Sequence, residues 1–366
     1  MTNSEQICNR LIEKCFLKEF VFSDLYVEVD GIRQELCDCL VSLNGISVVF
    51  QIKERNPEFK TDNESWLTKK IYKKATSQIK DTLSNWEIAE RTTFKNQYGD
   101  SVTLERGTQI IPVILFDNPQ IDNYIKVYHS KTSGAKINIF SLRDFETMLS
   151  VLIVPVDIID YLYLRAEYIG DDYPSLFIND VSPEKTLIGK ITSEKSLAEF
   201  FQLSHNVKEI DKLAIEAFMH IFEVFRDRQA NFQPQYFDLI ANLLSFDCQQ
   251  IEAFMTRFDL SWQRALNGES YLGNLMVYEH RNKRKGVLFI SNSEQYENSK
   301  NDLVLLDMFK YHFRLEEAMC ASFYKLGSDE VNDVFINWAL LKGDWIYDKG
   351  CEDILKKCGY WQQYKI

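Results

Sequence analysis

The sequence lacks the features that mark membrane-embedded and secreted proteins. It contains no run of about 18 apolar residues, the length that a membrane-spanning helix needs, and no charged segment followed by an apolar one at Met1. Its eight cysteines include no CxxC pair, and no pair of histidines stands at zinc-ligand spacing. We therefore expect a soluble cytoplasmic protein with reduced, mostly buried thiols and no membrane partner.

Positive charge is also scarce. The formal net charge of −12 argues against a protein coated in nucleic acid, because general affinity for nucleic acid comes from Lys and Arg side chains that neutralise phosphates. One stretch, Trp66 to Lys80, reads WLTKKIYKKATSQIK and carries no acid. It supplies local candidates for contact with nucleic acid: Lys69, Lys70, Lys73 and Lys74. A helix face of solvated lysines is the alternative interpretation.

The length of 366 residues exceeds what one hydrophobic core usually supports, so two domains are predicted. The stretch from Pro155 to Pro183 contains a Gly170-Asp171-Asp172 turn and is the candidate boundary. We expect a first domain of residues 1–154 and a second domain of residues 155–366. The sequence contains no internal repeat and no low-complexity tract.

Periodicity in the second half predicts an α+β domain. Residues 193–228 and 235–258 have helical patterns, a hairpin is expected across HRNKRKG, and helices are expected again from Asp302. We expect the basic residues of the hairpin turn to be solvated and not bound to nucleic acid: Arg281, Lys283, Arg284 and Lys285. Recognition, regulation and oligomerisation all stay open as roles for this domain.

Helix and strand patterns alternate in the first half. An amphipathic helix over 5–18 is followed by an extended segment over 25–29. From 64 to 90 apolar residues stand at helical spacing: Leu67, Ile71, Ala75, Ile79, Leu83 and Trp86. Strands are predicted over 110–116 and 136–140, and Ser141 with Asp144 is arranged to cap a following helix. This order predicts an α/β domain.

Asn44-Gly45 separates two apolar runs within 35–53 and is the strongest short-range hairpin signal in the chain. A two-residue turn pairs Leu43 with Ile46 and, when the register continues, Asp38 with Gln51. Directly opposed side chains share a face, with Cβ atoms about 5 Å apart, and Lys53 shares the face of Gln51. A carboxylate, an amide oxygen and an ammonium group are therefore expected close together.

These groups suit a hard cation. Mg²⁺ binds through oxygen atoms, usually with one or two protein carboxylates and several retained waters. Asp38 would hold the metal, the Gln51 side-chain oxygen would add a neutral ligand, and the Ile52 carbonyl oxygen lies beside them. Lys53 would orient or help to deprotonate a water and stabilise charge on a phosphate. In the simpler alternative, Asp38 and Lys53 form an ordinary cross-strand ion pair, with Gln51 solvated beside them.

The order of elements and the Asp38…Gln51-Ile52-Lys53 motif resemble the core of the PD-(D/E)XK nucleases, in the D…QxK form of the Mrr-like branch. The resemblance covers about the first 150 residues. It implies a restriction-endonuclease-like mixed sheet flanked by helices, and a Mg²⁺- or Mn²⁺-dependent endonuclease that hydrolyses DNA, often in restriction, repair or anti-phage defence. It also implies that Asp38 is a metal ligand, Gln51 a variant of the usual acidic ligand and Lys53 the catalytic lysine.

Further residues resemble supporting positions of that family. Gln78, on the lysine-rich helix, resembles a glutamine often found beside the site, and an ordinary boundary residue is the alternative. An acid of the first helix often supports the metal, and both Glu5 and Glu13 are candidates. Glu35 precedes Asp38 by an odd number of residues, so it points to the other face of the strand unless a bulge intervenes.

Two other functions stay open. A nuclease-like fold that binds nucleic acid or protein without hydrolysis is favoured by Gln51, which adds no negative charge for a metal. Cleavage of RNA is the other, because the same chemistry attacks phosphodiesters of either nucleic acid. The resemblance also makes a homodimer plausible, and the acidic bulk of the chain hints at a regulatory protein partner.

Overall fold

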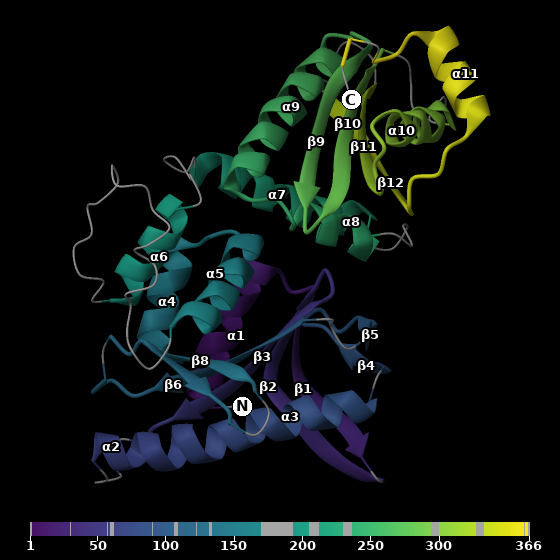
Figure 1. The fold of residues 1–366 in the computed structure, drawn as a ribbon. Coiled ribbons are helices and arrows are strands. Elements are labelled where there is room, and N and C mark those ends of the chain that lie inside the picture. The colour runs from purple at the N-terminus through teal and green to yellow at the C-terminus, as the bar shows by residue number, and fades with distance from the viewer. Residues whose placement is uncertain are drawn as a thin grey trace. The chain divides into compact units, whose positions relative to one another are not determined.

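The computed structural model forms two compact units, Met1–Lys208 and Glu209–Ile366, which are described separately (Figure 1). It describes residues 2–29, 31–56, 58, 62–89, 91–105, 109–121, 123–131, 134–169, 193–204, 212–229, 236–293, 300–326, 333–361 and 363–364. None of the helices in these ranges combines the length and the apolar character needed to cross a membrane.

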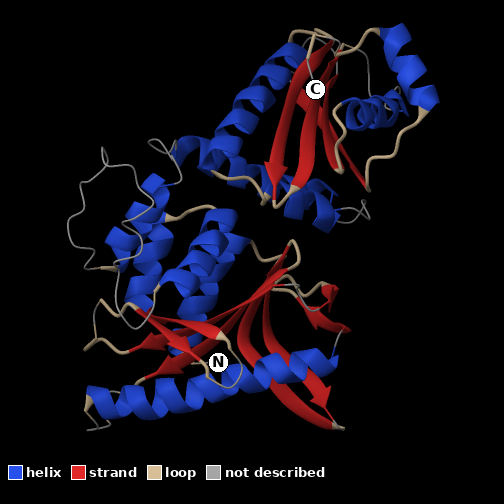
Figure 2. Ribbon diagram, viewed as in Figure 1, coloured by secondary structure: helices blue, strands red, loops and turns tan. Residues whose placement is uncertain are grey.

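The first unit is a mixed α/β structure. Its elements are α1 (Asn3–Phe16), β1 (Val21–Val29), β2 (Ile32–Leu43), β3 (Ile46–Glu54), α2 (Asn63–Trp66), the π-helical η1 (Leu67–Ala75), α3 (Thr76–Ala89), β4 (Arg91–Lys95), β5 (Ser101–Glu105), β6 (Gln109–Asp117), β7 (Lys126–His129), β8 (Lys136–Ser141), α4 (Leu142–Val151), α5 (Pro155–Tyr168) and α6 (Glu194–Ser204). The main sheet has the order β1-β2-β3-β6-β8-β7. Strands β3, β6 and β8 are parallel and the other neighbours antiparallel. The predicted mixed sheet flanked by helices is confirmed (Figure 2).

The β2–β3 hairpin has the predicted register. Asn44 and Gly45 have φ angles of 52° and 77°, the left-handed conformation that a type I′ turn requires at both central positions. Pairing begins at Leu43 and Ile46 and continues to Cys39 and Phe50. Both faces of these strands are largely buried, because helices cover the sheet on both sides (Figure 1).

The predicted apolar stripe of the lysine-rich helix faces the sheet. Ile71, Ala75, Ile79 and Trp86 are fully buried, in a core that includes residues of β2, β3, β6 and β8. From Leu67 to Leu83 the apolar residues of this stripe recur every four residues. In a regular α-helix, residues four apart are offset by about 40° around the helix axis, so the stripe would turn away from the sheet. The π-helical segment η1 has wider turns, which reduces this drift and keeps the stripe on the sheet.

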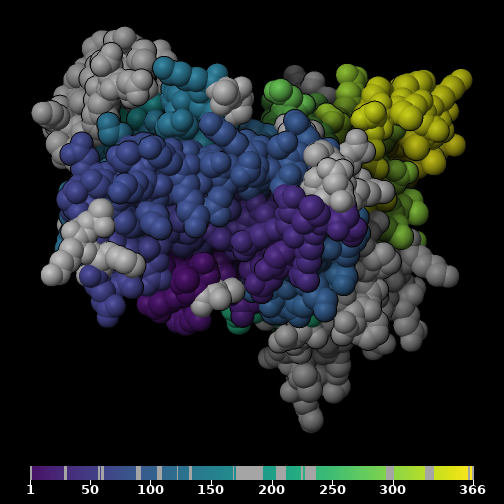
Figure 3. All heavy atoms as spheres, turned by 90° about the horizontal axis from the view of Figure 1, so that it is seen from below, coloured from purple at the N-terminus to yellow at the C-terminus, as the bar shows by residue number. Residues whose placement is uncertain are grey.

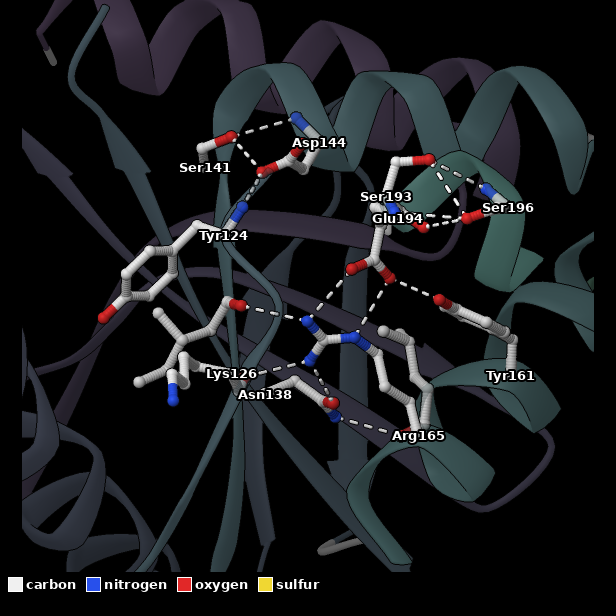
Figure 4. A network of polar contacts seen from close by, with 12 residues as sticks. Tyr124, Lys126, Asn138, Ser141, Asp144, Tyr161, Arg165, Ser193, Glu194 and Ser196 are labelled. Carbon is white, nitrogen blue, oxygen red and sulfur yellow. Dashed lines mark hydrogen bonds and ion pairs between the residues drawn. The ribbon is translucent and has the colours of Figure 1, made fainter. Parts of the chain in front are cut away.

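Helices α5 and α6 belong to the first unit, so the predicted boundary at residues 154/155 is corrected to Lys208/Glu209. Figure 4 shows the buried network that joins them to the sheet. The Arg165 guanidinium lies 3.0 and 3.1 Å from the two Glu194 carboxylate oxygens and donates to Asn138 Oδ1 at 3.0 Å. It also donates to the backbone carbonyls of Lys126 and Ile139. The candidate turn at residues 170–172 lies outside the described residues.

The second unit contains a four-stranded sheet of order β12-β11-β10-β9. Helix α9 packs on one face of this sheet, and α10 on the other (Figure 1). Its elements are α7 (Lys212–Gln229), α8 (Tyr236–Leu243), α9 (Cys248–Leu266), β9 (Tyr271–His280), β10 (Lys283–Asn292), α10 (Lys300–His312), β11 (Glu317–Leu326), β12 (Asp333–Lys342) and α11 (Lys349–Cys358).

Two expectations for the second unit are wrong. The helical region predicted from Asp302 ends at His312 and is followed by strands β11 and β12, whose apolar runs lack an alternating pattern because helices cover both faces. The basic turn is shorter than expected, since only Arg281 and Asn282 lie between strands β9 and β10. Lys285 lies within β10 and is buried, with its ammonium 2.8 Å from a Glu317 carboxylate oxygen.

A half-buried histidine predicts acid sensitivity of the second unit. Burial, with help from Lys285 and Arg281, lowers the pKa of His280 to about 4. Between about pH 4 and 6.5 the unfolded chain therefore binds more protons at this residue, so stability should fall as the pH decreases through that window. We expect His280→Gln to remove on the order of 1 kcal/mol of this loss, after allowance for solvent screening.

Urea unfolding at pH 4.5 and pH 7 measures this effect. The matched control is His220→Gln, which changes a histidine whose side chain is 70% exposed and should leave the pH dependence as it is in the unaltered protein. An equal pH dependence in all three proteins would contradict the role of His280.

Candidate functional site

The site lies where the β2–β3 hairpin stops pairing. The regular ladder ends at Cys39 and Phe50, one pair before the expected pairing of Asp38 with Gln51. Beyond that point the Asp38 carboxylate takes the place of a backbone partner and accepts a hydrogen bond of 2.5 Å from the Ile52 N–H. The expectation of a direct Asp38–Gln51 ladder pair is therefore corrected. The Asp38 carboxylate nevertheless lies beside the Gln51-Ile52-Lys53 segment.

Three oxygen atoms converge on the Lys53 ammonium. Its Nζ atom lies 3.2 Å from Gln51 Oε1, 2.8 Å from the Ile52 carbonyl oxygen and 3.6 Å from Asp38 Oδ2. The structure thus brings together the four residues that the sequence predicted for the chemical core. One carboxylate, one amide and one backbone carbonyl form a small site that already holds a positive group.

Burial gives these groups unusual electrostatics. The side chains of Lys53 and Asp38 are only 14% and 12% exposed. Burial raises the pKa of Asp38, although Lys53 and the Ile52 N–H oppose the shift. Burial also lowers the pKa of Lys53, against the attraction of Asp38, and the nearby charge of Lys74 lowers it further. A lysine whose proton is less tightly held is better suited to take up or release a proton during a reaction.

Acidic side chains surround this core. Glu5 of α1 acts on the pKa values of Asp38 and Lys53, whereas the charge of Glu13 acts on Cys39 instead. Of the two candidates on the first helix, Glu5 is therefore the one whose charge acts on the core. Its Oε2 atom also accepts the Thr2 N–H at 2.6 Å, as part of the cap of α1.

Two residues near this core, Asp117 and Cys8, were not assigned to the site by the sequence analysis. Asp117 ends strand β6 and, in the parallel register, pairs with Glu54 next to Lys53. Its Oδ2 atom accepts a hydrogen bond of 2.8 Å from Ser4 Oγ. Cys8 is buried nearby, and burial, followed by the charges of Asp117, Asp38 and Glu5, raises the pKa of its thiol to about 12. The sequence signal that could have identified Asp117 is an acidic residue at the carboxyl end of a buried strand, which lies next to β3 in the sheet.

The supporting candidates lie in two different settings. Glu35 is exposed, and the β1–β2 register shifts between Leu25 and Tyr26, directly beside it. Partial desolvation, Asp38 and Glu5 raise the pKa of Glu35, while Lys53 lowers it, so its carboxyl group shares the electrostatic environment of the site. Gln78 lies on α3, and its Oε1 atom is buried with no hydrogen-bond partner in the described part of the chain. One turn later, Thr82 Oγ1 donates to the carbonyl of Leu36, two residues before Asp38.

An exposed basic face lies on the helix beside the site. We call it the lysine face, and it consists of Lys69, Lys70, Lys73 and Lys74. In the described part of the chain none of their four ammonium groups forms an ion pair. The helix that carries them is the blue part of the surface in Figure 3. Lys74 acts on the pKa of Lys53, so the lysine face extends to the core of the site.

The donor atoms fit a hard divalent cation with weak protein coordination. Asp38, Gln51 and Ile52 present only oxygen atoms, and the ammonium of Lys53 shows that their arrangement favours positive charge. Among the described residues no group of three or more His, Cys, Asp and Glu side chains forms a metal-binding cluster. A cation here would therefore rely on one carboxylate, neutral oxygens and retained water, which is a pattern usual for Mg²⁺.

The chain matches no protein-family model, no curated protein and no solved structure. Its function has to be inferred from the geometry of the site.

Proposed function

We propose that the first unit is a metal-dependent endonuclease of the PD-(D/E)XK type that hydrolyses DNA. The observation that carries this proposal is the convergence of Asp38, Gln51 and the Ile52 carbonyl on one position, with Lys53 at its centre. The three acceptors also satisfy the three N–H groups of a buried ammonium, so the proposal depends in addition on the shifted pKa values of Asp38 and Lys53. A charge buried with several polar partners at a strand end is typical of a site built for chemistry.

The fold supports the same proposal. A helix, an antiparallel hairpin with the motif on its strands, a basic helix and a buried parallel strand follow one another in the first unit. This order is compatible with the restriction-endonuclease-like core that the motif suggests. Strands β2 and β3, which carry Asp38 and Lys53, are the second and third strands of the main sheet.

Each side chain has a task in this proposal. Asp38, Gln51 Oε1 and the Ile52 carbonyl would hold Mg²⁺ or Mn²⁺ in the position that the Lys53 ammonium occupies in the structure, so the ammonium would have to move aside when the cation binds. The cation would neutralise charge on a phosphate and make a bound water more acidic. Lys53 has its proton loosened by burial, so it is suited to orient the attacking water and to accept or donate a proton. Its remaining positive charge stabilises the phosphate oxygens as negative charge develops on them. Glu5 adds negative potential from α1.

The test is a cleavage assay of the full chain. Supercoiled plasmid, single-stranded DNA and structured RNA are incubated with Mg²⁺, with Mn²⁺ or with EDTA. We expect cutting of DNA that requires a divalent cation and stops with EDTA. Cutting of RNA alone would replace DNA as the substrate and would keep the proposed chemistry.

A second candidate function is a binding module that does not hydrolyse nucleic acid. It is favoured by the donor set, because Gln51 replaces a carboxylate and no acidic cluster of three is present among the described residues. Calorimetric titration with Mn²⁺ separates the two candidates. Nucleic-acid binding without any metal uptake and without cleavage would establish the second candidate and exclude the first.

The lysine face predicts the salt dependence of DNA binding. Each lysine that neutralises a phosphate releases counterions and makes the slope of log K against log salt concentration more negative by about 0.9. We expect the double variant Lys70→Gln/Lys74→Gln to bind DNA more weakly and to make this slope less negative by about 1.8. Fluorescence anisotropy with a labelled duplex at several salt concentrations measures both quantities.

The matched control removes the same charge from another exposed helix. Lys349→Gln/Lys357→Gln changes two exposed lysines of α11 and should leave the slope within about 0.3 of the unaltered value. Equal slopes for the two double variants would contradict a phosphate-binding role for the lysine face.

A further inference from the structure

The second unit contains a cavity of about 640 Å³, which lies in the range of about 300–1,000 Å³ that is typical of small-molecule sites. Its wall is formed by the start of β9, the end of β10, the first turn of α10, strand β11 and the segment that follows α11. Nothing in the proposed nuclease mechanism uses this cavity, because all of its lining residues belong to the second unit.

A buried carboxylate forms one polar part of the cavity wall. Asp302, in the first turn of α10, is only 3% exposed. Burial raises its pKa, while hydrogen bonds from Tyr324, Ser322 and Asn337 oppose the shift. These donors fix the orientation of the carboxylate. An ionised carboxylate has about four acceptor positions, so Asp302 can accept one further hydrogen bond from a ligand.

An unpaired donor forms a second polar part of the wall. The Asn292 side-chain nitrogen is buried and has no hydrogen-bond partner among the residues that the structure describes, and Asn292 lines the cavity. Buried donors without a partner are uncommon in folded proteins and call for an explanation. A ligand acceptor in the cavity would satisfy this nitrogen.

Aromatic side chains form a third part of the wall. Tyr271, Tyr360 and Trp361 line the cavity, and the Tyr271 ring is held in place by the Arg264 guanidinium, 3.5 Å from the ring centroid. The lining residues include no Lys and no Arg. An anionic group such as a phosphate is therefore disfavoured inside the cavity, whereas a flat heterocycle is favoured by the aromatic side chains.

We propose that this cavity binds a nucleobase. A nucleobase edge carries a hydrogen-bond donor next to an acceptor, which matches Asp302 as acceptor and Asn292 as donor, and its faces suit the aromatic wall. The base belongs either to a free nucleoside or to a nucleotide extruded from DNA, with the phosphates outside the cavity in both cases. This binding does not depend on the nuclease activity of the first unit.

Isothermal titration calorimetry of the full chain with adenosine, cytidine, guanosine and thymidine tests the first source. We expect at least one nucleoside to bind with a stoichiometry of one. Asn292→Ala should weaken this binding about tenfold without lowering the melting temperature, because the removed amide nitrogen makes no hydrogen bond with the described residues. The matched control Asn267→Ala changes an exposed asparagine outside the cavity and should bind as tightly as the unaltered protein.

A steric variant tests the cavity by a different route. A Cβ atom at Gly273 would lie 2.5 Å from the Tyr271 hydroxyl, so Gly273→Ala has to displace the Tyr271 ring in the cavity wall. We expect this variant to weaken nucleoside binding at least as much as Asn292→Ala. Unchanged binding in both variants would overturn the proposal.

The second source is tested with a DNA duplex that contains one mismatched base. If the cavity takes an extruded base, Asn292→Ala should weaken binding of the mismatched duplex about tenfold and leave binding of the fully paired duplex unchanged. Binding of the fully paired duplex reports on DNA binding by the first unit. A loss of binding by the first unit would weaken binding of both duplexes, so it can be told apart from a loss at the cavity, which affects the mismatched duplex alone. No saturable binding of any nucleoside, together with equal binding of both duplexes by the variant and the unaltered protein, would overturn the proposal.

Discussion

Replacing Lys53 with alanine is expected to lower kcat/KM for metal-dependent DNA cleavage by about 10²–10³-fold, because the variant loses a preorganised positive charge at the phosphate. Asp38→Asn should lower it at least as much. The amide keeps the size of the side chain but removes the only carboxylate among the three converging oxygens. Initial rates on plasmid DNA at several substrate concentrations measure both effects.

Two controls separate chemistry from folding. Asp81→Asn changes an exposed acid on α3, and Lys80→Ala changes a partly exposed lysine of the same helix. Both should retain activity within about twofold, since surface substitutions are usually within about 0.5 kcal/mol of neutral. Full activity in Lys53→Ala, at an unchanged melting temperature, would show that the nuclease assignment is wrong.

Removing Glu194 is expected to destabilise the first unit by about 3–5 kcal/mol. Both partners of the Arg165–Glu194 pair are completely buried, so Glu194→Ala leaves an uncompensated positive charge in the core. The double variant Arg165→Met/Glu194→Leu removes both charges and should recover most of the lost stability. Unfolding in urea, monitored by circular dichroism, gives the free energy of each variant.

An exposed pair in the same unit provides the matched control. Lys136 and Glu167 form an ion pair whose side chains are 33% and 40% exposed, and Glu167→Ala should cost less than about 1 kcal/mol. If Glu194→Ala and Glu167→Ala cost the same, the buried network does not hold α5 and α6 on the sheet.

The sequence predicted the first unit well where local signals and burial agree. Asn44-Gly45 fixed both the turn and the register, because two adjacent left-handed residues admit few alternatives. The stripe from Leu67 to Trp86 located the buried face of a helix, and Ser141 marked the start of α4 by accepting the Asp144 N–H. The same hairpin brought Asp38 and Lys53 together, so the centre of the site followed from pattern alone.

Features that depend on distant contacts were not predictable in the same way. Strands β11 and β12 are covered on both faces, so their apolar runs carry no alternation that distinguishes strand from helix. The boundary of the first unit depends on Arg165 and Glu194, which are 29 positions apart in the sequence. The position of Glu5 near the core, and the pairing of Asp117 with Glu54, depend on how α1 and β6 pack on the hairpin.

The Arg165–Glu194 network also bears on how this protein can change in evolution. The ion pair ties the end of α5 to the start of α6, and each charge depends on the other, because a substitution of one residue alone leaves the second charge buried and unpaired. Positions 165 and 194 are therefore expected to change together, or not at all, in related sequences.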